Sequence, residues 1–184
     1  MTEVYAMITD GTEEVECLAV VDILRRAGIE TEIVSATDTK EVATSHGVRI
    51  TADKTISEVE LDNAKVIFVP GGMPGSKLLG ENHRLISAID SALKKGNRVA
   101  AICAAPALVL GEHGFLVGKS AVCYPGHEES MLGATVMHGA RVVTDENITT
   151  ARGMGCAIDL GLELVGLLRD EDLANEIAGK IQLQ

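Results

Sequence analysis

Residues 98–110 read Arg-Val-Ala-Ala-Ile-Cys-Ala-Ala-Pro-Ala-Leu-Val-Leu, and this stretch decides the fold class. Its first half is apolar and follows the polar residues 94–97, which predicts a buried strand. Pro106 fits the first turn of a helix, so we expect Cys103 at a strand-to-helix corner. Unpaired backbone N–H groups and the helix dipole at such a corner favour the reactive thiolate. The alternative is a small buried apolar residue, as most free cysteines are.

The rest of the chain alternates in the same way between apolar strand-like and amphipathic helical segments. This alternation predicts an α/β protein with a mainly parallel sheet, helices on both faces and one domain over residues 1–184. We expect strands at Val4–Ile8, Ile29–Ser35, Lys65–Pro70 and Ser120–Cys123, three short strands within 134–151, a hairpin at 41–51, and helices at Glu13–Gly28, Asn82–Lys95, Gly155–Leu168 and Asp170–Ile181.

Composition excludes several classes of function. The net charge of −11 opposes binding to nucleic acid, and 2% aromatic residues leave no stacking platform for single strands. The four cysteines are dispersed, which indicates a reducing compartment without disulfides. We find no signal peptide, no membrane span, no nucleotide-binding motif and no metal-ligand spacing, so we expect a cytoplasmic protein without a cofactor, a metal or a membrane partner.

Glu16 is the second informative residue. Positions 16, 20, 23, 24 and 27 share one helix face, and all but the first are apolar. A carboxyl group on this face must be protonated or find hydrogen-bond donors. The alternative is an ordinary acidic residue in the first turn of a helix.

Gly71 and Gly72 follow a predicted strand and leave backbone N–H groups open to a ligand. Together with the Ala104 N–H, they could form an oxyanion hole, although most glycine pairs are simply tight turns. Carboxyl ends of parallel strands meet at one edge of a sheet, so we expect these residues to gather near Cys103. Among the histidines, His127 is the best candidate for reaching the site, because it follows a predicted strand.

Five motifs in this order resemble the DJ-1/ThiJ/PfpI superfamily, and most closely its DJ-1 branch. They are Thr12-Glu13-Glu14-Val15-Glu16, Arg25-Arg26-Ala27-Gly28-Ile29, Val69-Pro70-Gly71-Gly72, Ala100-Ala101-Ile102-Cys103-Ala104-Ala105-Pro106 and Thr150-Ala151-Arg152-Gly153. The resemblance implies a flavodoxin-like three-layer sandwich with Cys103 on a nucleophile elbow. It implies that a protonated Glu16 donates to the Cys103 thiolate, that the Gly72 N–H faces the sulfur, and that the first helix and the hairpin form a homodimer.

The resemblance implies three kinds of activity. The first is cofactor-free glyoxalase or deglycase chemistry on a small aldehyde or glycated substrate, in a pocket to which Gly71, Tyr124, His127 and Arg152 could belong. The alternative is an oxidative-stress sensor or chaperone that uses oxidation of Cys103. A cysteine peptidase is the least favoured reading, because Ala104 stands where peptidase-like members carry histidine. Tyr124 likewise stands where the DJ-1 branch carries histidine.

Overall fold

The computed structural model describes residues 2–183 and is organised around a seven-stranded sheet with the order β10-β11-β7-β6-β1-β2-β5. All neighbouring strands are parallel except β10 and β11. The strands span Val4–Ile8 (β1), Thr31–Ser35 (β2), Lys54–Thr55 (β5), Val66–Val69 (β6), Arg98–Ile102 (β7), Val142–Asp145 (β10) and Ile148–Ala151 (β11).

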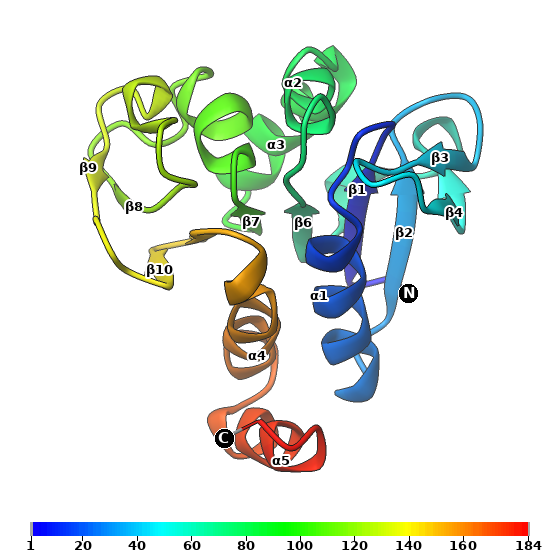
Figure 1. Ribbon diagram of the computed structural model, residues 1–184, viewed down its shortest axis with the longest axis vertical. Helices are drawn as coiled ribbons and strands as arrows, with labels where there is room; N and C mark the ends of the chain where they lie inside the picture. Colours follow the sequence, from blue (N-terminus) through cyan, green and yellow to red (C-terminus); the bar gives the residue numbers. More distant parts are fainter. Residues whose placement is uncertain (1, 184) are drawn as a thin grey trace.

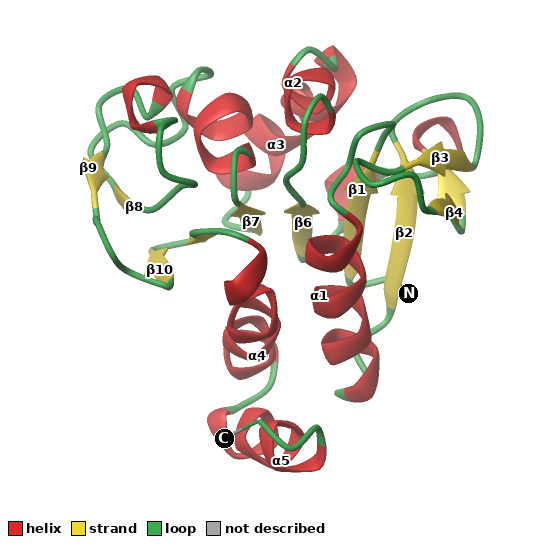
Figure 2. Cartoon of the chain, viewed as in Figure 1, coloured by secondary structure: helices red, strands yellow, loops and turns green. Residues whose placement is uncertain are grey.

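Helices cover both faces of this sheet (Figures 1 and 2). Side chains along β1 alternate, so that Ala6 and Ile8 join one apolar core while Met7 joins the other. The first core is closed by α1 (Glu14–Arg26), α4 (Ala157–Leu168) and α5 (Glu171–Lys180), and the second by α2 (Gly75–Gly80), α3 (His83–Lys94) and the short helix η3 (Pro106–Gly111). The predicted α/β flavodoxin-like three-layer sandwich is therefore confirmed.

Smaller elements complete the chain. The predicted hairpin is an antiparallel pair, β3 (Glu41–Ala43) and β4 (Arg49–Thr51), and β8 (Ser120–Ala121) pairs with β9 (Thr135–Val136). Short 3-10 turns lie at Ile56–Glu58, Leu61–Asn63, Glu128–Ser130 and Met154–Cys156. No helix within residues 2–183 is both long and apolar enough to cross a membrane.

Two local features differ from the sequence-based expectation. The sequence pattern predicts no helix between β6 and Asn82, whereas the structure has α2 at Gly75–Gly80. Gly75 packs closely against the first loop, since an added β-carbon would lie 2.6 Å from the backbone nitrogen of Thr12. The helix expected after Cys103 is only six residues long and has the wide π-type turn, with the Glu112 N–H donating to the Ala107 oxygen. The short helix weakens the dipole that the sequence led us to expect at Cys103.

Candidate active site

Cys103 lies directly after β7, at the carboxyl edge of the parallel strands. Its backbone has a φ of 66°, a left-handed conformation that is uncommon for a residue other than glycine. Two hydrogen bonds hold it there: its N–H donates to the Ala151 oxygen at 2.9 Å, and its oxygen accepts from the Tyr124 N–H at 2.7 Å. Cys103 is half-buried, whereas Cys17, Cys123 and Cys156 are buried.

Glu16 reaches the same edge from the first turn of α1. Glu13 caps that helix, since its carboxylate accepts from the Glu16 N–H at 2.6 Å. The Glu16 side chain is fully buried, and its Oε2 accepts from the Gly71 N–H at 2.8 Å. Its Oε1 has no hydrogen-bond partner among the described residues. A buried carboxyl oxygen left unpaired is costly, and such costs concentrate at functional sites.

Gly71 separates the carboxyl group from the thiol side chain. A β-carbon at this position would lie 2.5 Å from both the Cys103 β-carbon and the Glu16 Oε2. Only glycine therefore allows these two side chains to approach the same point. Its neighbour Gly72 has a φ of 96° and packs against the backbone of Gly11. The predicted gathering of the two glycines, Glu16 and Cys103 at one edge is what the structure shows.

Burial controls the protonation of Glu16. Removal from water raises its pKa from 4.5 to about 7, although contact with Cys103 and the Gly71 N–H act in the opposite direction. The nearby charge of Glu13 raises it further. Glu16 therefore titrates close to neutral pH, where general acid and base groups are most effective.

Burial also raises the pKa of Cys103, to about 12, and the negative charge of Glu16 acts in the same direction. The N–H groups of Ala104 and Gly72 lower this pKa without outweighing burial. The direction is opposite to the one expected from the strand-to-helix corner alone, because the sulfur is half-buried beside an acid and the following helix is short. Beside an ionised Glu16, the thiol keeps its proton.

The two protonations are coupled, because the charge of Glu16 raises the pKa of the Cys103 thiol. With a pKa of about 7 for Glu16 and about 12 for Cys103, both groups carry a proton below neutral pH and Glu16 alone is ionised above it. Protonation of Glu16 removes its repulsion of the thiolate, which the Ala104 and Gly72 N–H groups favour.

The remaining candidate residues fall into separate cavities. Tyr124 and Arg152 line a cavity of about 450 Å³, and His127 lines another of about 510 Å³. Gly71 lines neither of them. The rings of Tyr124 and His127 lie 6.5 Å apart, centre to centre, with no stacking. The four residues proposed as one pocket are thus divided, with a turn at Pro125 and Gly126 between Tyr124 and His127.

A group of possible metal ligands lies beside the site. Glu13, Glu14 and His46 place a ligand atom each within 4.8 Å of one another. Sequence spacing does not reveal this group, because His46 comes from the β3–β4 hairpin, far along the chain from α1. His46 Nδ1 and the Glu14 carboxylate are 3.3 Å apart, so a hydrogen bond between them is one way in which these side chains are held together.

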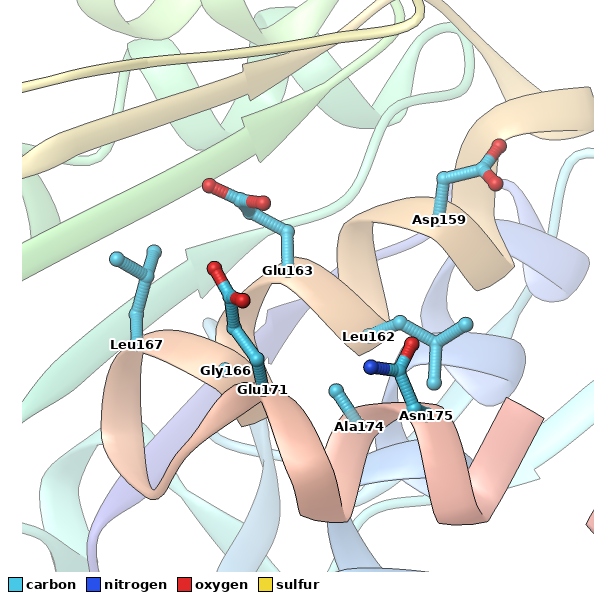
Figure 3. Close-up of a pocket in the computed structure, with 8 residues that line it drawn as sticks. All are labelled: Asp159, Leu162, Glu163, Gly166, Leu167, Glu171, Ala174 and Asn175. Atoms are coloured by element: carbon cyan, nitrogen blue, oxygen red, sulfur yellow. The ribbon is translucent and has the colours of Figure 1, made fainter. Parts of the chain in front are cut away.

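A further cavity of about 380 Å³ lies between α4 and α5 (Figure 3). Three carboxylates line it, from Asp159, Glu163 and Glu171. Asp159 pairs with Arg141, and Glu163 accepts from the Thr144 hydroxyl at 2.7 Å. Neither Cys103 nor Glu16 lines this cavity.

Known proteins are similar to this chain over most of its length. The sequence model of the DJ-1/PfpI family matches residues 2–167. The solved structure of oxidized DJ-1 from Toxoplasma gondii is similar, with a TM-score of 0.92 and 35% identity over 99% of this chain and 98% of that one.

Two curated relatives differ in how much of their length is matched. Protein DJ-1 homolog B of Arabidopsis thaliana is 32% identical over 99% of this chain, which spans 42% of that protein's length. The glutathione-independent glyoxalase DJR-1.2 of Caenorhabditis elegans is 26% identical over 91% of this chain and 89% of that protein.

Proposed function

Because this chain belongs to the DJ-1/PfpI family, we propose that it performs cofactor-independent thiol chemistry on α-oxoaldehydes or their adducts, as a glyoxalase or deglycase. The observation that carries the proposal is the buried Glu16 carboxyl group, packed with the Cys103 thiol against Gly71. A thiol next to a carboxyl group that titrates near neutral pH can form a bond to a carbonyl carbon, and the carboxyl group can then move protons on the adduct. The similarity to a protein named as a glyoxalase supports this choice.

The proposed reaction is balanced without a redox cofactor. Glu16 takes the proton of Cys103, the sulfur attacks the aldehyde carbon, and Glu16 returns the proton to the oxygen of the resulting hemithioacetal. The backbone N–H groups of Gly72 and Ala104 lie beside the sulfur and can stabilise that oxygen while it is charged. Glu16 then moves the proton of the former aldehyde carbon to the adjacent carbon, while the hydroxyl proton of the hemithioacetal passes to the oxygen on that adjacent carbon, which gives the thioester of a 2-hydroxy acid. Water cleaves the thioester and releases a 2-hydroxy acid and the free thiol.

The test is consumption of methylglyoxal with release of lactate. We expect Cys103→Ala and Glu16→Gln to lose the activity, and Cys123→Ala, a buried cysteine away from Glu16, to retain it. Equal rates in Cys103→Ala and the parent protein would exclude the assignment.

A second function is supported by the unequal exposure of the cysteines. Cys103 alone of the four is not fully buried, so peroxide meets this sulfur first. Two equivalents of peroxide each transfer one oxygen to the sulfur and leave as water, which gives a sulfinate beside Glu16. This alternative is an oxidative-stress sensor or chaperone. Intact-mass analysis after mild peroxide should find one two-oxygen adduct at Cys103, and scattered oxidation of all four cysteines would argue against it.

We also infer a single domain that acts as a cytoplasmic homodimer through α1 and the β3–β4 hairpin. Exposed apolar side chains on these elements support the dimer: Val15 and Leu18 on α1, and Val48 next to β4. Sedimentation equilibrium should find a dimer that Leu18→Glu converts to a monomer, and an unchanged mass would remove this interface. The partners we expect are a small aldehyde or glycated substrate and the second copy, with no nucleic acid or membrane.

A further inference from the structure

Among residues 2–183, one group of side chains has the spacing of metal ligands. Glu13, Glu14 and His46 each place a ligand atom within 4.8 Å of the others. His46 Nδ1 is 3.3 Å from the Glu14 carboxylate and 3.9 Å from Glu13 Oε1. Two ligands of a tetrahedral zinc ion, each about 2.0–2.1 Å from the metal, are about 3.3 Å apart. The three side chains therefore need only small movements to hold one ion.

The backbone that carries these side chains is already fixed by hydrogen bonds. The β3–β4 hairpin lies beside the loop that leads into α1 (Figure 1), and the Gly11 N–H donates to the Ala43 oxygen at 2.8 Å. In the same place, the Ser45 N–H donates to the Thr12 oxygen at 2.9 Å. The Asp10 carboxylate accepts from the Ala43 N–H at 2.8 Å. Because the hairpin and α1 are held together in this way, an ion that binds between them has little chain to order.

The two carboxylates lie close together with little positive charge around them. The side chains of Glu13 and Glu14 are 13% and 12% exposed, and among residues 2–183 neither pairs with a lysine or an arginine. Glu13 Oε2 caps α1 by accepting from the Glu16 N–H, which leaves Oε1 on the side of His46. Carboxylates that are largely removed from water need a compensating partner, and a divalent cation balances both charges at once.

Thr44 gives a second, independent indication of a ligand. This residue is 6% exposed, and its hydroxyl has no hydrogen-bond partner among residues 2–183. The hydroxyl lies beside the Glu14 carboxylate without completing a hydrogen bond to it. Carboxylates that bind metals are in turn hydrogen-bonded by neighbouring groups. If Glu14 turns one oxygen to a metal ion, its other oxygen can accept from Thr44, and the buried hydroxyl is then satisfied.

We propose that Glu13, Glu14 and His46 bind a divalent transition-metal ion of the zinc class, with water as the fourth ligand. An imidazole together with carboxylates favours Zn²⁺, whereas Mg²⁺ and Ca²⁺ prefer oxygen ligands alone. This site goes beyond the proposed thiol chemistry, since no cysteine belongs to it. The bound ion joins the first turn of α1 to the hairpin and stabilises the folded chain.

The test is calorimetric titration with Zn²⁺ of protein without a histidine tag. We expect one ion per chain in the parent and also in Cys103→Ala, which lacks the reactive thiol as a competing ligand. His46→Ala and Glu14→Gln should each weaken binding at least about tenfold, because each removes a ligand. His138→Ala and Glu129→Gln, which change exposed residues outside the group, should bind as the parent does.

Two outcomes of the titration would overturn the proposal. One is the absence of Zn²⁺ binding in the parent, and the other is binding that is lost in Cys103→Ala but kept in His46→Ala, which would place the ion at the thiol. Neither outcome depends on turnover of methylglyoxal, so the proposed glyoxalase activity is judged separately.

Thermal denaturation provides a second readout of the same site. The His46 side chain is 70% exposed, so we expect His46→Ala to fold as the parent does. Zn²⁺ should raise the midpoint of unfolding of the parent, because the ion binds the folded chain, and should leave that of His46→Ala unchanged. An equal rise in both proteins would show that the ion binds elsewhere and would overturn the assignment.

Discussion

Two carboxylates at opposite ends of the sheet have opposite environments. Glu3 lies directly before β1, where Arg169 donates to it at 2.6 Å and Lys65 at 2.8 Å, and these contacts lower its pKa to about 2. Glu16 lies beyond the carboxyl end of β1 with no cation in contact among residues 2–183, and burial raises its pKa to about 7. At the amino end of the sheet, the ion pairs of Glu3 stabilise the fold. At the carboxyl end, the ionised form of Glu16 destabilises the fold, as is common for ionisable groups at functional sites.

The largest expected effect is the destabilisation of the fold when Glu16 ionises. Its folded-state pKa lies above the unfolded value, so its stabilising contribution is complete below about pH 4.5 and is lost as the pH rises through about 7. In Glu16→Gln this loss of stability does not occur, because glutamine does not ionise. Between pH 4.5 and 8.5, the free energy of unfolding of the variant should gain roughly 3 kcal/mol relative to the parent.

Urea denaturation at several pH values measures this difference. Glu129→Gln, an exposed residue, provides the matched change in net charge. If the difference in free energy of unfolding between Glu16→Gln and the parent stays constant with pH, the ionised Glu16 does not destabilise the fold. The contrast between Glu16 and Glu3 would then be wrong.

The next effect concerns the glycine that lets the carboxyl and thiol groups meet. In Gly71→Ala, the added β-carbon needs the space of Glu16 and Cys103, so one of these side chains must move. Displacement of about 1 Å can reduce a rate about hundredfold, and we expect a loss of this size in alkylation or methylglyoxal turnover. Gly179→Ala in α5 meets no atom within 4 Å and should leave the rate unchanged. Equal rates in the two variants would remove Gly71 from the site.

The smallest effect lies at the amino end of the sheet. The pKa of Glu3 is below its unfolded value, so its contribution to stability is present above about pH 4.5 and is lost as the pH falls through about 2. Glu3→Gln should cost about 1 kcal/mol at pH 7, since the pair is near the surface.

The cost of Glu3→Gln should vanish near pH 2 in thermal denaturation. Glu41→Gln, whose carboxylate pairs with Arg49 at 3.8 Å in an exposed setting, should have a smaller effect than Glu3→Gln at pH 7. A cost in Glu3→Gln that persists at pH 2 would mean that packing, and not charge, is responsible.

The sequence by itself determined the alternation of strands and helices, the position of Cys103 after a strand, and the place of Glu16 on the buried face of a helix. These features depend on hydrophobic periodicity and on glycine and proline, which act within a few residues. The family resemblance added the pairing of Glu16 with Cys103.

Only the tertiary structure decided the electrostatics of the site. Glu16, Gly71, Cys103 and Arg152 are far apart in the chain, and packing alone brings them to one edge of the sheet. The local argument predicted a thiolate at Cys103, yet the pKa of a group depends on how much water and which charges surround it. Burial beside Glu16 reversed the expected direction, and no local pattern records how deeply a side chain is buried or which distant charge lies next to it.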